Sequence, residues 1–218
     1  MRRLGLLGGT FDPVHVGHVA VGRAAAAALD LEEVRVVPSR IPPHRPGPCT
    51  SGYHRFAMTA LACLGEPAWT VSDVELQRDG PSYSFDTLTA IAAADGLAPT
   101  QIFFLIGADA FAEIATWSRY PAVLDLAHFV VVTRPGTPFD AVRSRVPGLA
   151  GRMAASDAVG TATATRIVAI ETATPDVSST DIRARASRGQ PLAGLVPDPV
   201  ERYIHRHGLY GPPADRRR

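Results

Sequence analysis

Short apolar segments, rich in β-branched residues, alternate along the chain with longer segments of helical pattern. Such alternation distinguishes buried strands from the helices that connect them. Strands are predicted at residues 4–7, 34–37, 70–76, 102–106, 129–133 and 166–170. Helices are predicted at residues 16–29, 51–65, 84–94, 108–115, 179–187 and 199–207.

This order of elements predicts an α/β fold, a doubly wound parallel sheet in a single domain. Several strands are apolar throughout, which is typical of a parallel sheet covered by helices on both faces. A chain of 218 residues is long enough to bury one core of this kind. We expect the domain to span residues 1–210, with helices from about residue 178 packing against it, and residues 211–218 to form a flexible basic tail.

The composition is that of an ordinary globular protein. Hydrophobic residues make up 46% of the chain and charged residues 20%, with a formal net charge of +1. A charge so near zero creates no global field that would attract nucleic acid or a membrane surface. The first residues pass directly into a glycine turn, so we expect no signal peptide, and no apolar segment reaches membrane-spanning length. We therefore expect a cytoplasmic protein without nucleic-acid or membrane partners. The oligomeric state stays open, a homo-oligomer included.

All 22 basic residues are arginines, and the sequence contains no lysine. Any cationic contact to a phosphate must therefore come from arginine or histidine, and chemistry through a lysine Schiff base is excluded. The phosphate-binding motif GxxxxGK[ST] is excluded for the same reason, and no GxGxxG follows the first strand. Cys49 and Cys63 lack metal-ligand spacing, so we expect free thiols.

Five polar motifs follow predicted strands. They lie at residues 8–18, 42–45, 107–109, 134–136 and 177–183. In an open α/β sheet, ligands bind beyond the carboxyl ends of the strands. We therefore expect these motifs, which are distant in sequence, to converge on one edge of the sheet.

The first motif, residues 8–18, has the sequence GGTFDPVHVGH. His15 and His18 are three positions apart at a helix start and so share one face. The preceding glycine pair permits a sharp turn whose N–H groups, together with the helix N-terminus, favour an anion. Gly17 is expected to leave room for a ligand. Histidines that cap or pack the helix, and a zinc site, are alternative interpretations, although no further His or Cys cluster completes a zinc site.

Residues 177–183, VSSTDIR, also allow two interpretations. Ser178 and Asp181 form a pair that resembles a capping box at a helix start. The hydroxyl and N–H groups could equally hold a polyphosphate, with Arg183 as the counter-charge, and both roles are compatible. Trp117, one of two tryptophans, suits either a core position or stacking on an aromatic ring.

Together these motifs resemble those of bacterial nicotinate-nucleotide adenylyltransferases. The similarity runs from Leu4 to Tyr210 and includes, in order, GGTFDPVHVGH, PPHR, SYSFDTL, IGAD, TWSRY, RPG and VSSTDIR. The combination of GxFDPxHxGH with SSTxIR is typical of the wider nucleotidyltransferase superfamily. PSYSxDTL, PPH and TW single out this family.

The resemblance implies a Rossmann-like nucleotidyltransferase fold and transfer of an adenylyl group from ATP to nicotinate mononucleotide, with release of pyrophosphate. It implies that His15 and His18 are catalytic. It implies that ATP is bound by Gly8, Gly9, Thr10, Phe11, His15, His18, Gly107, Asp109, Arg134, Ser179, Thr180 and Arg183. It implies that the mononucleotide is bound by His44, Arg45, Ser84 and Trp117.

The chemistry of this reaction agrees with the residues present. The attacking group is a phosphate, which is anionic at neutral pH, so no general base is needed. Catalysis should come from in-line positioning and from stabilisation of charge on the α-phosphoryl oxygens, which suits His15 and His18. Few carboxylates flank the phosphate motifs. We therefore expect Mg²⁺ to be held by phosphate oxygens and water, with no metal ligand from the protein.

The chain departs from the family pattern at Arg45, where lysine is common, at Ser84, where threonine is usual, and at Val177, where isoleucine is usual. Three alternatives are weaker. Pantetheine-phosphate adenylyltransferases have threonine in place of His15 and a shorter chain. Cytidylyltransferases lack the Trp117 and PSYS features, and both intact histidines argue against a catalytically silent nucleotide sensor.

Overall fold

The computed structural model describes residues 2–43, 50–136 and 139–211. Its six strands form one parallel sheet in the order β3-β2-β1-β4-β5-β6. They are β1 (Leu4–Gly9), β2 (Glu33–Pro38), β3 (Trp69–Val71), β4 (Ile102–Gly107), β5 (His128–Thr133) and β6 (Ile167–Glu171). This is the strand order of the doubly wound Rossmann fold, so the predicted fold class is confirmed.

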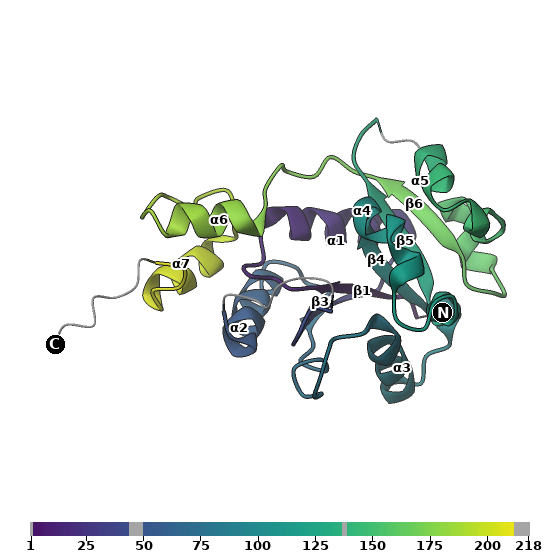
Figure 1. The fold of residues 1–218 in the computed structure, drawn as a ribbon, viewed down its shortest axis with the longest axis horizontal. Coiled ribbons are helices and arrows are strands. Elements are labelled where there is room, and N and C mark those ends of the chain that lie inside the picture. The colour runs from purple at the N-terminus through teal and green to yellow at the C-terminus, as the bar shows by residue number, and fades with distance from the viewer. Residues whose placement is uncertain (1, 44–49, 137–138, 212–218) are drawn as a thin grey trace.

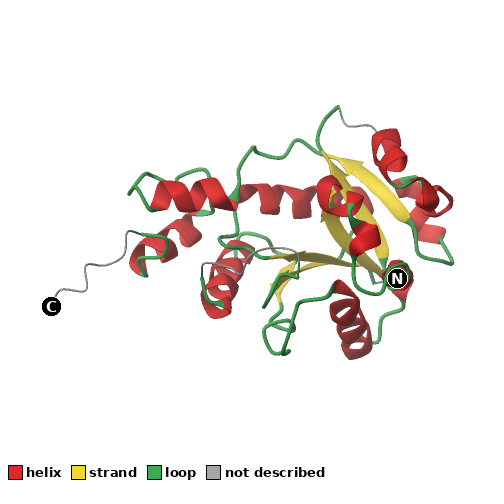
Figure 2. Ribbon diagram, viewed as in Figure 1, coloured by secondary structure: helices red, strands yellow, loops and turns green. Residues whose placement is uncertain are grey.

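Helices cover both faces of the sheet (Figure 1, Figure 2). They are α1 (Val16–Leu29), α2 (Gly52–Cys63), α3 (Ser84–Asp95), α4 (Ala108–Ala112), α5 (Phe139–Arg145), α6 (Ser179–Ala186) and α7 (Asp198–Arg206). Each described helix is too short or too polar to cross a membrane.

The apolar strands divide the core into two clusters because successive side chains of a strand point to opposite faces. In β4, Phe103 and Leu105 enter the cluster that also contains residues of α1, α2, α6 and α7. Ile102, Phe104 and Ile106 enter the cluster that contains residues of α3, α4 and α5. The continuous apolar strands seen in the sequence are therefore buried on both sides, as expected.

Several predicted helix ends are confirmed by their caps. α1 has the predicted bounds, and the side chain of Ser51 accepts a hydrogen bond from the His54 N–H at the start of α2. Gly96 ends α3 with φ 64°, a left-handed conformation that glycine adopts without a steric penalty.

The predicted strand at residues 70–76 is wrong beyond Val71. The Ser72 hydroxyl accepts a hydrogen bond from the Val74 N–H, and the Asp73 carbonyl accepts one from the Gln77 N–H. These local bonds turn the chain away from the sheet edge. The predicted helix at residues 108–115 is also shorter, because α4 ends at Ala112 and 3₁₀ turns follow it.

The two C-terminal helices lie at one end of the molecule, where α7 packs against α2 (Figure 1). α7 contacts α2 through a hydrogen bond between the Tyr203 hydroxyl and His54 Nδ1, 3.0 Å long. The backbone N–H of Val16, at the start of α1, donates to the Leu195 carbonyl between α6 and α7. Most of the expected tail lies outside the described residues, so the division at residue 210 stays a prediction.

Candidate active site

A topological switch point lies at the centre of the sheet, between β1 and β4. α1 follows β1 and packs in the first core cluster, whereas α4 follows β4 and packs in the second. The chain therefore leaves these neighbouring strands toward opposite faces, and open α/β sheets bind ligands in the crevice that results. The turn between β1 and α1, residues 10–15, lies at this crevice.

This turn is built around Phe11. Phe11 has φ 51°, a left-handed conformation that residues with a side chain rarely adopt, and it is 1% exposed. Its ring occupies the space beside Gly9, where a Cβ atom would lie only 2.9 Å from the ring. The same ring meets His18 in an edge-to-face arrangement, with 4.9 Å between ring centroids. Gly9 is therefore needed for close packing within the turn.

The two histidines of the motif stack on each other. Their ring centroids are 3.7 Å apart and the ring planes differ by 27°. His18 Nδ1 accepts a hydrogen bond from the backbone N–H of His15 at 3.2 Å. In neutral His18 the proton is therefore on Nε2, and this atom is the hydrogen-bond donor that His18 can offer to a ligand.

His15 differs from His18 in its burial. It is 8% exposed, and burial lowers the pKa of its imidazole from 6.5 to about 4, so the ring is neutral at neutral pH. A Cβ atom at Gly17 would lie 3.1 Å from this ring. The space opened by Gly17, which we expected a ligand to use, is thus occupied by His15. Among the described residues, no three His, Cys, Asp or Glu side chains form a metal site.

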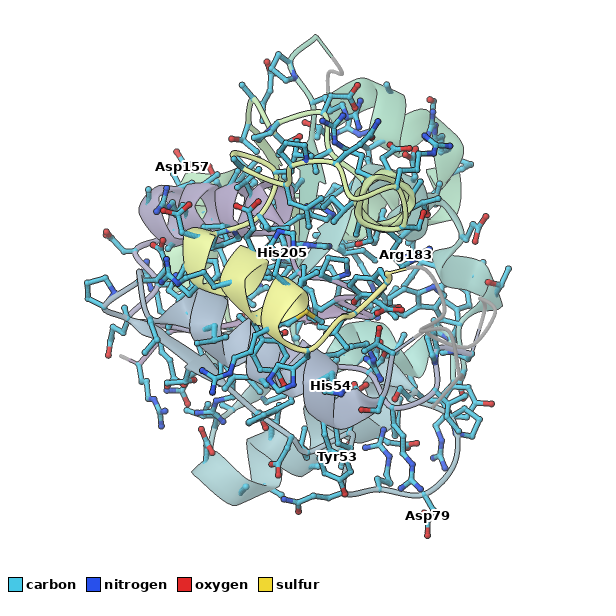
Figure 3. All side chains as sticks on the ribbon, turned by 90° about the vertical axis from the view of Figure 1, so that its left-hand side faces the viewer. Tyr53, His54, Asp79, Asp157, Arg183 and His205 are labelled. Carbon is cyan, nitrogen blue, oxygen red and sulfur yellow. The ribbon has the colours of Figure 1, made fainter. Side chains whose placement is uncertain are left out.

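The start of α6 is tied to the same turn. The Ser179 hydroxyl donates to the Pro13 carbonyl at 2.9 Å, and the Arg183 guanidinium donates to the Asp12 carbonyl at 2.7 Å. Arg183 also contacts the Thr180 hydroxyl, at 3.3 Å. Figure 3 shows Arg183 on the face of the molecule that also carries His54. Two distant sequence motifs therefore meet here, as predicted.

The capping interpretation of the α6 motif is also confirmed. The Ser178 hydroxyl oxygen accepts a hydrogen bond from the Asp181 N–H at 3.1 Å. Ser178 therefore serves the helix, while Ser179 and Arg183 reach the turn.

A second group of predicted residues lies on the other side of β1. Phe104 meets Trp117 edge-on, with 6.0 Å between ring centroids. The same Phe104 ring lies 3.8 Å from the position that a Cβ of Gly8 would occupy. The Phe104 ring thus contacts both Trp117 and the end of β1. Trp117 itself is half-buried.

Ser84 is the first residue of α3 and is half-buried. The next residue, Phe85, lies beneath the guanidinium of Arg119, whose central carbon is 4.7 Å from the ring centroid. This contact joins the start of α3 to the segment that follows Trp117. The direction of the Arg119 side chain, which the sequence does not give, is thus toward the Phe85 ring.

Comparison with known proteins agrees with this geometry. Residues 6–185 match the family described as cytidylyltransferase-like. Over 210 residues, the chain is 40% identical to a probable nicotinate-nucleotide adenylyltransferase of Bordetella petrii, with 96% of this chain and 100% of the relative covered. It is 41% identical to a Pseudomonas aeruginosa protein of the same name, with 97% and 99% covered. The chain belongs to the nicotinate-nucleotide adenylyltransferase family.

A solved structure supports the fold. The Plasmodium falciparum nicotinic acid mononucleotide adenylyltransferase complexed with NaAD superposes with a TM-score of 0.73, covering 96% of this chain and 98% of that chain. The sequence identity is 16%, so this likeness shows the fold alone.

Three further residues expected at an adenylyltransferase site lie at the carboxyl edge of the sheet but not against the histidines. Gly107 caps α4, and apart from its chain neighbours no atom lies within 4 Å of the position its Cβ would take. The Asp109 side chain is fully exposed and reaches Arg145 at 3.4 Å. Arg134 is 73% exposed and pairs with Asp176 at 3.5 Å. Their predicted ATP contacts stay predictions.

His44 and Arg45, which the resemblance places at the mononucleotide, lie outside the described residues.

Sequence reasoning missed two residues that contact the turn. The Tyr210 hydroxyl donates to the buried Asp12 carboxylate at 2.6 Å, and burial, together with this bond, raises the pKa of Tyr210, so the hydroxyl stays protonated. Arg55, in α2, is 1% exposed and donates to the Thr10 carbonyl at 2.7 Å. Tyr210 is the last residue of the family similarity seen in the sequence, whereas no local pattern marks Arg55.

Proposed function

We propose that this protein transfers the adenylyl group of ATP to nicotinate mononucleotide, giving nicotinate adenine dinucleotide and pyrophosphate for NAD biosynthesis. The observation that carries the proposal is the stacked pair of His15 and His18 at the switch point, joined to α6 through the turn that both motifs share. We propose a cytoplasmic protein whose partners are these small molecules, without nucleic acid or membrane.

In the proposed reaction, a phosphate oxygen of the mononucleotide attacks the α-phosphorus of ATP. The bond from that phosphorus to the bridging oxygen breaks, and pyrophosphate leaves with the electron pair. His18 Nε2–H and the N–H groups of the turn would donate to phosphoryl oxygens, and Arg183 would balance the charge of the triphosphate. His15 is neutral at neutral pH, so it would act as a packing partner and dipole and not as a cation.

The site suits a Mg²⁺ ion that arrives with the nucleotide. Asp12 lies at the turn, but its carboxylate is buried and accepts a hydrogen bond from Tyr210. The described residues form no cluster of metal-binding side chains. We propose that Mg²⁺ is held by triphosphate oxygens and water, where it would neutralise part of their charge.

We propose that the acid is preferred over nicotinamide mononucleotide. The pyridine ring would stack on Trp117, and its carboxylate would accept hydrogen bonds from the Ser84 hydroxyl and from backbone N–H groups. Arg119, which lies over Phe85 next to Ser84, would add a positive charge on the same side. A neutral amide presents its own N–H to these donors and leaves some unpaired, at about 1–3 kcal/mol each. The acid should therefore have a kcat/KM at least about tenfold higher.

The test is pyrophosphate release from ATP with a panel of mononucleotides. Nicotinate mononucleotide should be the best acceptor, and absence of pyrophosphate with every acceptor would refute adenylyl transfer. His18→Ala should lower kcat by on the order of 10²–10³, because one oriented donor is lost. The matched control is His205→Ala, since His205 is an exposed histidine of α7 and should leave kcat near wild type. Near-normal turnover of folded His18→Ala would remove His18 from the mechanism.

A further inference from the structure

Arg55 has an unusual position for an arginine. It lies in the first turns of α2 and is the largest side chain in the described chain with less than 2% exposure. Burying a guanidinium is unfavourable because its hydration is lost, and this desolvation lowers the pKa of Arg55. Asp12 and Glu75 act in the opposite direction, and a guanidinium stays charged at neutral pH. A full positive charge is therefore enclosed behind the turn.

The guanidinium is bonded to the main chain through all three of its nitrogens. One terminal nitrogen donates to the Thr10 carbonyl at 2.7 Å, and the other donates to the Arg40 carbonyl at 3.4 Å. Nε donates to the Thr50 carbonyl at 3.2 Å. Arg55 thus joins the turn after β1 to Arg40, which lies just beyond β2, and to Thr50, which precedes the N-cap of α2. Its shortest bond is to the turn.

The bond from Arg55 to the Thr10 carbonyl fixes the orientation of the peptide unit between Thr10 and Phe11. In a trans peptide, the carbonyl of one residue and the N–H of the following residue point in opposite directions. Because the Thr10 carbonyl points inward to Arg55, the Phe11 N–H points away from Arg55. The preceding unit is fixed in the same way, since the Gly9 carbonyl accepts from the Ser39 N–H at 2.8 Å. The Thr10 N–H is therefore directed away from β2, which is the side of β4.

Phe11 also needs such an anchor. Its φ of 51° is unfavourable for a residue with a side chain, by roughly 1–2 kcal/mol. The hydrogen bond from the buried, planar Arg55 guanidinium to the Thr10 carbonyl, in the peptide just before Phe11, holds this conformation in the absence of ligand. The turn is thus organised before a phosphate arrives, as electrostatic stabilisation requires.

We propose that Arg55 is a positioning residue that acts from behind the turn: by holding the Thr10 carbonyl, it directs the Phe11 N–H at the triphosphate of ATP. The inference rests on the proposed function, since it takes ATP as the ligand of the turn. It goes beyond that function by assigning a role to a residue that does not contact substrate.

The experiment compares Arg55→Met and Arg55→Lys with a matched control, Arg3→Met. Arg3 is also an arginine that donates to a backbone carbonyl, that of Leu29 at 2.8 Å, but it precedes β1 at the opposite edge of the sheet. Binding of inorganic tripolyphosphate and of nicotinate mononucleotide is measured separately by calorimetry. Thermal unfolding of each variant is recorded so that loss of fold is seen directly.

Arg55→Met should weaken tripolyphosphate binding about tenfold to hundredfold, the range for one lost oriented donor, and should change mononucleotide affinity by less than about twofold. Arg55→Lys should be intermediate, because lysine keeps the charge but cannot hold three carbonyls with a planar fork. Arg3→Met should leave both affinities at wild-type values. The Phe11 amide proton should move downfield when wild type binds tripolyphosphate, and this movement should be lost in Arg55→Met.

Unchanged tripolyphosphate affinity in Arg55→Met, or equal weakening of both ligands, would overturn the inference. If Arg55→Met does not fold, Arg55→Lys decides: wild-type affinity together with a wild-type Phe11 amide response would overturn it. Tripolyphosphate binding needs no turnover. The inference can therefore fail while wild-type adenylyl transfer stands, and adenylyl transfer can fail while the Arg55 effect on anion binding is seen.

Discussion

The buried His15 makes the stability of this protein depend on pH in a way that can be measured. Its imidazole has a pKa of about 4 in the folded chain and 6.5 when solvated. Because the folded value is the lower one, the unfolded chain binds the proton first as the pH falls. The contribution of His15 is therefore fully present above pH 6.5 and is lost as the pH falls from 6.5 toward 4.

The size of the effect follows from the pKa difference. Each pKa unit corresponds to about 1.36 kcal/mol, so acidification from pH 7.5 to pH 5 should lower the free energy of unfolding by about 2 kcal/mol through His15 alone. The variant His15→Asn removes the titrating group. Between pH 7.5 and pH 5, the free energy of unfolding of His15→Asn should therefore fall by about 2 kcal/mol less than that of wild type.

The assay is urea unfolding of both proteins at pH 7.5 and pH 5. The comparison uses the difference between pH values, so a constant destabilisation of His15→Asn at every pH cancels. The buried His128, whose pKa is also lowered by burial, is present in both proteins and cancels too. His205→Asn, at an exposed position, should keep the wild-type difference. An equal pH-dependent loss in wild type and His15→Asn would show that burial does not keep His15 neutral.

Three further predictions concern the contacts of the site. Arg183→Ala should raise the Kd for ATP more than that for the mononucleotide, with partial rescue in Arg183→Lys; coincident ATP titrations would contradict this role. Ser84→Ala should reduce the ratio of kcat/KM for acid over amide severalfold, whereas Trp117→Ala should weaken both mononucleotides alike; kinetics with the two substrates decide. Gly17→Ala should lower kcat without a matching fall in Tm, because the new Cβ at 3.1 Å displaces the His15 ring while alanine favours the helix; unchanged kcat would argue against a precise ring position.

The fold could be predicted from the sequence because its signals are local and agree with one another. Residues 102–106 are apolar at every position, which indicates a strand buried on both faces, and β4 has such burial. Ser51 and Gly96 mark helix ends through bonds and backbone angles that involve only their neighbours. The meeting of the first and last motifs at the turn also followed, since parallel strands end at the same edge.

Other features depend on contacts that no local pattern reveals. Arg55 occupies a helix position where an arginine would ordinarily be exposed, and only the meeting of three segments around it makes burial possible. Glu75 was predicted within a strand, but its carboxylate is buried and accepts a hydrogen bond from Thr87 at 2.6 Å. α5 is short, and the 3₁₀ turns that follow it contain one proline and three glycines, so the sequence gives no clear helical pattern there.

The turn can bind an anion through uncharged donors because hydrogen bonds within the protein already occupy three of its carbonyl groups. Those of Thr10, Asp12 and Pro13 are bound by Arg55, Arg183 and Ser179, respectively. With these acceptors occupied, a negatively charged ligand at the turn would meet N–H groups, His18 and the Arg183 guanidinium and not carbonyl oxygens. Attack by an anionic phosphate on a second anionic phosphate needs this kind of surface, because no proton has to be removed and the main obstacle is charge repulsion. In the proposed reaction, binding of the triphosphate to Arg183 would compete with the Asp12 carbonyl for one guanidinium and would thereby couple ATP binding to the attachment of α6.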